Sequence, residues 1–111
     1  MNSAYAFFEN LASEIPEIPP DSIISRTIYS DEQVKVVLFS FAQGQELSEH
    51  TASQAALLFF VQGEARLTLG EDQMEAHPGT WVRMQPQLPH SVFARTPLVM
   101  LLLLLQEVPL K

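Results

Sequence analysis

The sequences GQELSEHTASQAALLFFVQG, residues 44–63, and GTWVRMQPQLPHSVFA, residues 79–94, decide the fold. Each segment begins with a glycine, contains a run of apolar residues and carries one histidine, which is His50 in the first and His90 in the second. Glycine permits the positive φ angles of tight turns, so we expect turns at these glycines. The two segments therefore predict short strands joined by tight turns.

The flanking sequence has the same character. Residues 98–105 read LVMLLLLL, which is too short for a membrane-spanning helix of about 20 residues and instead predicts a strand buried on both faces. Short strands separated by turn signals predict an all-β sandwich or barrel. The expected strands are Ile23–Tyr29, Val34–Phe41, Ala55–Val61, Glu64–Leu69, Thr80–Met84, His90–Arg95 and Leu98–Val108.

The N-terminal region differs from the rest of the chain. We expect residues 1–22 to form a short N-terminal helix and a Pro-rich linker, and residues 23–111 to form the barrel domain. Ser3 is a possible helix cap and Pro16 would end the helix. An apolar stripe at three- and four-residue spacing supports the helix, and it comprises Ala4, Phe7, Phe8, Leu11 and Ile15.

Composition bounds the function. The 111 residues fit one domain, and the absence of cysteine excludes disulfides and thiol chemistry. The net charge of −7 disfavours nucleic-acid binding, because an acidic surface repels phosphate groups. The first 14 residues carry no positive charge, unlike a secretory signal. We therefore expect a cytoplasmic protein without a membrane or nucleic-acid partner.

The two segments resemble the paired motifs of the cupin superfamily. The first family motif runs glycine, five residues, histidine, one residue, histidine, three or four residues, glutamate, six residues, glycine. In this chain Gly44, His50 and Gly63 match that pattern. Ala52 stands at the place of the second histidine, and Ala56 stands at the place of the glutamate.

The second family motif runs glycine, five residues, proline, one residue, glycine, two residues, histidine, three residues, asparagine. Gly79 and His90 match it. The proline, glycine and asparagine places hold Gln85, Gln87 and Ala94. The resemblance covers about half of the chain and implies a double-stranded β-helix, the cupin or jelly-roll barrel.

The resemblance also implies a metal site of three histidines and one glutamate that holds iron, manganese, nickel or zinc. Of these donors the chain retains His50 and His90, which would lie on neighbouring strands and point inward. Mononuclear iron sites usually need two histidines and a carboxylate, and catalytic zinc usually has three protein ligands. Glu49 should face away from its neighbour His50, because side chains alternate along a strand. A divalent transition metal at the two histidines is therefore a possibility that the sequence leaves open.

The expected ligand pocket is more apolar than a complete metal site, because two donors are replaced by alanine. Such a pocket favours a small hydrophobic or amphipathic ligand. The two histidines are equally well explained as pocket residues that bind water or backbone groups. The predicted pocket residues are His50, Ala52, Gln54, Ala56, Leu58, Phe60, Met84, His90 and Val92.

Three functions remain open from the sequence: a small-molecule binding barrel, a small metal-dependent dioxygenase or isomerase that uses His50 and His90, and a protein-interaction or structural module. Whether the protein is an enzyme is undecided.

One face of residues 98–105 should fill the barrel, and the other needs cover from the N-terminal helix or a second subunit. The resemblance implies a homodimer. Trp81 is expected in the core or in an interface.

Overall fold

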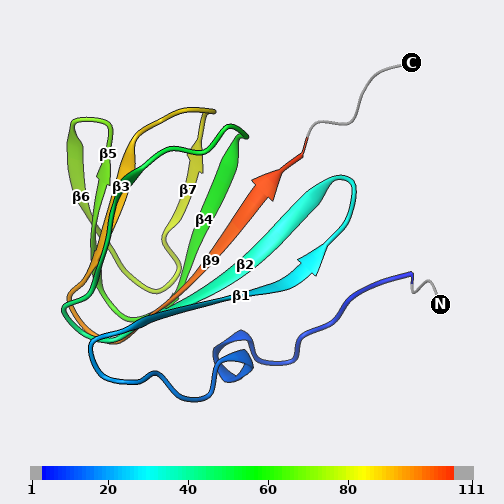
Figure 1. Ribbon diagram of the computed structural model, residues 1–111, viewed down its shortest axis with the longest axis horizontal. Coiled ribbons are helices and arrows are strands. Elements are labelled where there is room, and N and C mark those ends of the chain that lie inside the picture. The colour runs from blue at the N-terminus through cyan, green and yellow to red at the C-terminus, as the bar shows by residue number, and fades with distance from the viewer. Residues whose placement is uncertain (1–3, 107–111) are drawn as a thin grey trace.

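The computed structural model describes residues 4–106, and these residues form an almost entirely β structure (Figure 1). Apolar runs bounded by turn residues become strands, as the sequence predicts. The strands are β1 (Ile23–Ser30), β2 (Val34–Phe41), β3 (Glu46–His50), β4 (Ala56–Gln62), β5 (Ala65–Leu69), β6 (Asp72–Ala76), β7 (Trp81–Met84), β8 (His90–Ala94) and β9 (Leu98–Leu105).

The strands form two antiparallel sheets. A five-stranded sheet has the order β1-β2-β9-β4-β7, and a four-stranded sheet has the order β3-β8-β5-β6. The two sheets face each other, and the β1–β2 hairpin extends to one side (Figure 1). The predicted all-β double-stranded β-helix is thus the observed architecture.

The core lies between the two sheets. It contains the inward side chains of β4 and β9 and those of the four-stranded sheet, including Phe60, Met100, Leu67 and Val92. The predicted strand Leu98–Val108 is present as β9, which ends at Leu105, and the predicted end at Val108 lies outside the described residues. The two faces of β9 enter two different apolar clusters. Leu98 and Met100 lie in the central core, whereas Val99 packs on the opposite face of the sheet.

Two strands, β3 and β6, were not among the expected strands. Their sequences, ELSEH and DQMEA, are polar and weak in β-forming residues, and most of their side chains are exposed. Both lie at the edges of the four-stranded sheet. Charged side chains on an edge strand discourage pairing with another chain, so the polar pattern fits the position in the sheet although it hides the strand.

The short N-terminal helix is a single 3-10 turn, η1 (Leu11–Glu14), and is shorter than the apolar stripe suggested. The side chain of Asn10 caps it by accepting a hydrogen bond from the Ala12 amide at 3.1 Å, whereas the expected cap, Ser3, lies outside the described residues. An isolated helix of this length is marginal in water, so packing decides the conformation. Ile15 is buried against the outer face of the five-stranded sheet, as the expected covering role requires.

No helix within residues 4–106 has the length and apolar character needed to cross a membrane.

Gly63 shows why the motif glycines are needed. It has a φ of +91° in the turn between β4 and β5. A Cβ atom there would lie 2.1 Å from the carbonyl oxygen of Pro97 and 3.0 Å from the Cα of Leu98. Gly63 therefore satisfies both a left-handed backbone and a close approach of two chain segments. Gly79, with a φ of +97°, has the backbone requirement but no heavy atom within 4 Å of the Cβ position.

Candidate functional site

The fold brings His50 and His90 together. His50 ends β3 and His90 begins β8, and the two residues are direct partners across these antiparallel strands. Their ring centroids are 4.1 Å apart, with an interplanar angle of 57°. The structure therefore places the two retained motif histidines side by side on neighbouring strands, as expected.

An irregularity in β3 sets the direction of His50. Leu47 pairs with Val92 and His50 pairs with His90, so β3 uses one more residue than β8 between these two pairs. A bulge of this kind reverses the usual alternation of side chains. It keeps Leu47 and His50 on the same side of the strand, and the neighbouring Glu49 is exposed.

Both imidazole rings are held in the same way. Nδ1 of His50 lies 3.0 Å from the carbonyl oxygen of Ser48, and Nδ1 of His90 lies 2.9 Å from that of Leu88. A carbonyl oxygen only accepts hydrogen bonds, so each Nδ1 must be the donor. In the neutral form of each ring the proton is therefore on Nδ1, and Nε2 carries a free lone pair.

Burial differs between the two rings. His90 is only 5% exposed, whereas His50 is exposed to solvent. Burial lowers the pKa of His90, and the neighbouring His50 lowers it further, while the hydrogen bond to the Leu88 carbonyl opposes the shift. His90 is therefore neutral at pH 7, and its Nε2 is available as an acceptor or ligand.

The donor set at this position does not fit the four-ligand metal site of the family. Ala52 and Ala56 stand at the other two motif places and have no donor atoms. Within residues 4–106 no group of three or more His, Cys, Asp or Glu residues is arranged to hold a metal ion. The two Nε2 atoms would occupy two coordination positions, which is fewer than the usual set of catalytic zinc or mononuclear iron.

Most of the other predicted pocket residues belong to the packed core. Each is at most 2% exposed, and all lie in one apolar cluster: Ala56, Leu58, Phe60, Met84 and Val92. The barrel interior at these positions is filled by side chains. A ligand inside the barrel would therefore require this core to open. A ligand beside His50 and His90 would instead lie at the end of the barrel that carries them.

A crevice opens at that end of the barrel. It has a volume of about 440 Å³, within the usual range for small-molecule sites. Gln54, one of the predicted pocket residues, contributes to its wall, and Ala52 is partly buried nearby in sequence. The residues that line it are Ser53, Gln54, Ala55, Pro86, Leu105 and Gln106. They come largely from the segment that follows His50 and the segment that precedes His90.

Gln87 joins those two segments, and sequence reasoning gave it no role at the site. Its backbone amide donates a hydrogen bond of 2.7 Å to the carbonyl oxygen of Ala52. Its φ is +69°, a left-handed conformation that non-glycine residues seldom adopt. The available signal was its position, because Gln87 occupies the place of a glycine in the second motif.

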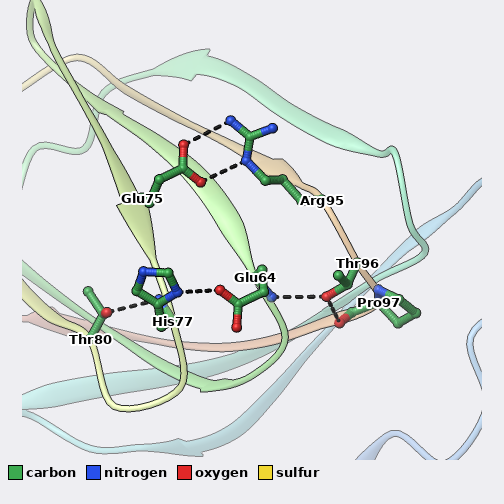
Figure 2. Close-up of polar contacts among 7 residues, drawn as sticks. All are labelled: Glu64, Glu75, His77, Thr80, Arg95, Thr96 and Pro97. Carbon is green, nitrogen blue, oxygen red and sulfur yellow. Dashed lines mark hydrogen bonds and ion pairs between the residues drawn. The ribbon is translucent and has the colours of Figure 1, made fainter.

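The third histidine, His77, lies elsewhere. It is exposed in the turn between β6 and β7, at the opposite end of the strands from His50 and His90. Figure 2 shows its Nδ1 facing the carboxylate of Glu64, with which it forms an ion pair when protonated. The Glu64 amide in turn donates to Oγ1 of Thr96 at 2.9 Å. These contacts join turns, so we assign them a structural role.

Comparison with known proteins agrees with this geometry. The family model described as the cupin domain matches residues 37–104. The search of curated proteins found no match.

Solved structures share the fold across most of the chain. A cupin superfamily protein from Desulfitobacterium hafniense has 22% identity and a TM-score of 0.80, with 88% of this chain and 90% of that chain covered. A conserved Streptococcus pyogenes protein of unknown function has 24% identity and the same TM-score, with coverage of 98% and 93%. A Cupin 2 conserved barrel domain protein from Leptotrichia buccalis has 25% identity and a TM-score of 0.76, with coverage of 85% and 46%. The motifs, the barrel and the family match lead to one conclusion: the chain belongs to the cupin family.

Proposed function

We propose that this protein binds a small, partly apolar molecule at the histidine-bearing end of the barrel and holds it through Nε2 of His50 and His90. The observation that carries the proposal is the shared orientation of the two rings, in which both Nδ1 atoms are occupied by backbone carbonyls. In the neutral form, each of the two rings, whose centroids are 4.1 Å apart, has an Nε2 lone pair, which favours a ligand that donates hydrogen bonds.

The surroundings of the two rings favour an amphipathic ligand. Ala52 and Ala56 stand where the family has polar donors, and the core beneath the site is apolar. A hydroxyl or amine group could donate to Nε2, while a short carbon chain could occupy the crevice beside Gln54 and Leu105. A carboxylate is a poor head group, because an ionised carboxylate only accepts hydrogen bonds.

The test uses three probes of equal chain length: hexan-1-ol, hexylamine and hexanoate. Binding is followed by nuclear magnetic resonance of the His50 and His90 side-chain nitrogens. We expect the alcohol and the amine to shift the Nε2 signals and hexanoate to leave them unchanged. His77 is the internal control, because it lies at the other end of the barrel. Equal responses to all three probes, or no response to any, would contradict the proposal.

A metal-dependent enzyme is the second candidate, and the same free Nε2 pair favours it. Metal-ligating histidines commonly donate Nδ1–H to a backbone carbonyl, which orients Nε2 toward the metal. The test is plasma mass spectrometry of untagged protein after incubation with iron, manganese, nickel or zinc, repeated with His50→Ala. One equivalent of a metal that is lost in the variant would make this candidate the leading one and replace the organic ligand.

The third candidate is an interaction module that uses the barrel as a scaffold. The loss of two family donors and the filled interior support it. A chain that binds neither the organic probes nor a metal, yet retains a cooperative fold after His50→Ala and His90→Ala, would favour this candidate over the other two.

A further inference from the structure

The outer face of the five-stranded sheet carries an apolar row that ends in a cation. Strand register places four residues in this row, which crosses the sheet from β2 through β9 and β4 to β7: Val36, Leu103, Leu57 and Arg83. Because the neighbouring residues of the same strands fill the core, the row faces away from the barrel. A path of apolar side chains therefore leads across the sheet to a guanidinium group.

A groove lies over the β2 end of this row. It has a volume of about 370 Å³ and lies between the N-terminal segment and strands β1, β2 and β9. Phe8 and Leu11 line it from the segment, Leu101 and Leu103 line it from β9, and none of the described residues in its walls is charged. A water molecule occupies about 30 Å³ of the liquid and a methylene group is of similar size, so the groove has room for roughly a dozen methylene groups. Its size and walls suit a linear hydrocarbon chain.

The charges around the groove differ between its two sides. At the β1 side the Tyr29 hydroxyl donates a hydrogen bond of 2.6 Å to the carboxylate of Asp31, and Arg26 is paired with Glu14 at 3.3 Å. At the β7 side Arg83 is exposed and has no ion-pair partner within residues 4–106. The outward residues of β4, β7 and β9 include no carboxylate. An anionic group is therefore repelled at the β1 side and attracted at the β7 side.

We propose that this face binds a free long-chain carboxylate, a fatty acid anion, with its hydrocarbon chain in the groove and across Leu57 and its carboxylate at Arg83. Three inter-strand steps of about 4.8 Å separate β2 from β7, which gives about 14 Å. An extended chain of about 12 carbon atoms has a similar length, because each carbon–carbon bond is about 1.5 Å long. The planar guanidinium can donate two parallel hydrogen bonds to a carboxylate.

The exposed aromatic residues at the β7 end complete the site. Trp81 lies two residues before Arg83 on the same face of β7, and its partner across the strands is Phe59. Trp81 is 60% exposed and Phe59 is 36% exposed, so a bound chain can cover both rings. The net charge of −7 repels anions at long range, so most of the affinity must come from buried hydrocarbon. We therefore expect binding to strengthen with chain length.

This site is separate from the histidine pair. It lies on the outer face of the five-stranded sheet, whereas His50 and His90 belong to the four-stranded sheet. The ligand proposed for the histidines donates hydrogen bonds, which an ionised carboxylate does not. Failure of one proposal therefore leaves the other standing.

The first test is fluorescence of Trp81, the one tryptophan in the sequence. The wild type is titrated with dodecanoate below the concentration at which micelles form. We expect a blue shift that saturates at one equivalent, while the Nε2 signals of His50 and His90 stay unchanged. Each buried methylene strengthens binding by up to roughly fourfold, so decanoate should bind several-fold more weakly. A response that does not saturate, or a shift of the histidine signals without a change at Trp81, would overturn the proposal.

Two neighbouring phenylalanines give a matched pair of variants for the groove. Phe8 lines the groove, whereas Phe7 is 76% exposed and lies outside its walls. Phe8→Ala should weaken dodecanoate binding by about fivefold or more, and Phe7→Ala should change it by less than about twofold. Circular dichroism checks that both variants fold. Equal effects in two folded variants would show that the chain does not enter the groove.

A second pair of variants tests the head group. Arg83→Gln should weaken dodecanoate binding by about threefold, as expected for an exposed ion pair, without weakening that of dodecyltrimethylammonium. Lys35→Gln removes the same charge from an exposed residue that faces the other side of β2, so it should have little effect on either ligand. Equal losses of dodecanoate binding in both variants would contradict a carboxylate at Arg83.

Other occupants of the face give different results in the fluorescence experiment. A second copy of the chain on this face would shield Trp81 beforehand, and dodecanoate would then cause no change. A membrane-binding face would respond to phosphatidylcholine vesicles and not to dodecanoate. Either result would overturn the proposal.

Discussion

Replacing Gly63 with alanine should destabilise the barrel more than the same replacement at the other motif glycines. The new Cβ atom would lie 2.1 Å from the Pro97 carbonyl oxygen, far inside van der Waals contact, and 3.0 Å from the Leu98 Cα. Both neighbours belong to the backbone, so neither can move aside as a flexible side chain would. The left-handed φ of +91° adds strain for any residue with a Cβ atom.

The magnitude follows from these two contributions. A left-handed conformation costs about 1–2 kcal/mol for a non-glycine residue, and forced overpacking costs about 1–3 kcal/mol. We expect Gly63→Ala to lower the free energy of unfolding by about 2–5 kcal/mol. Because small domains are stable by only about 5–15 kcal/mol, this is a large fraction of the total.

Gly79→Ala separates the two contributions. Its φ of +97° is nearly the same, but no heavy atom lies within 4 Å of the added Cβ. The effect of alanine on the unfolded chain is equal in both variants and cancels. Urea unfolding followed by circular dichroism should show a loss of about 1–2 kcal/mol for Gly79→Ala. If Gly63→Ala costs no more than Gly79→Ala, the close approach of the chain to Pro97 is wrong.

Three further predictions concern single residues. Gln87→Gly should leave the free energy of unfolding unchanged or raise it by up to about 1 kcal/mol, because it removes left-handed strain while adding conformational entropy to the unfolded chain. Chemical denaturation measures this free energy, and a clear loss would contradict the strain at Gln87. Ser40→Ala should be neutral or stabilising in thermal denaturation, because the buried Ser40 hydroxyl has no hydrogen-bond partner among the described residues. A loss of more than about 1 kcal/mol in the free energy of unfolding would show that the hydroxyl does have a partner. Because burial lowers the pKa of His90, the unfolded chain binds the proton more readily, and the stability of metal-free protein should fall as the pH drops below about 6.5. Urea unfolding at a series of pH values should show this loss in the wild type and a smaller one in His90→Gln; equal pH profiles would contradict the shift.

Much of the fold could be predicted from the sequence, because the signals were local. The apolar runs of β2, β4 and β9 and the turn glycines identify strands by composition alone. The edge strands β3 and β6 could not be found in that way, because they bury few side chains and their register is set by hydrogen bonds to β8 and β5. The apolar pattern also could not predict the length of the N-terminal helix, because packing against a sheet distant in sequence determines that length.

The candidate site was predictable in part. Motif spacing brought His50 and His90 into one site, and the strand register gives their contact. The bulge before His50 and the carbonyl partners of the two Nδ1 atoms depend on backbone geometry that has no sequence signature. Those features decide which ring nitrogen is paired with the backbone and which is not, and only the three-dimensional structure reveals them.

In this chain the main-chain hydrogen bonds at the motif positions form although some of the family side chains are missing. The amide of Gln87 bonds to the Ala52 carbonyl, and the amide of Gly44 bonds to the Ala94 carbonyl at 2.8 Å, although Ala52 and Ala94 lack the family side chains. These bonds use main-chain atoms, which every residue type supplies. Gln87 even keeps a left-handed φ without being glycine, because the surrounding contacts fix the loop. Alanine at these motif positions therefore leaves the barrel intact. Membership of the family follows from the framework residues, whereas any metal binding would depend on the two histidines that remain.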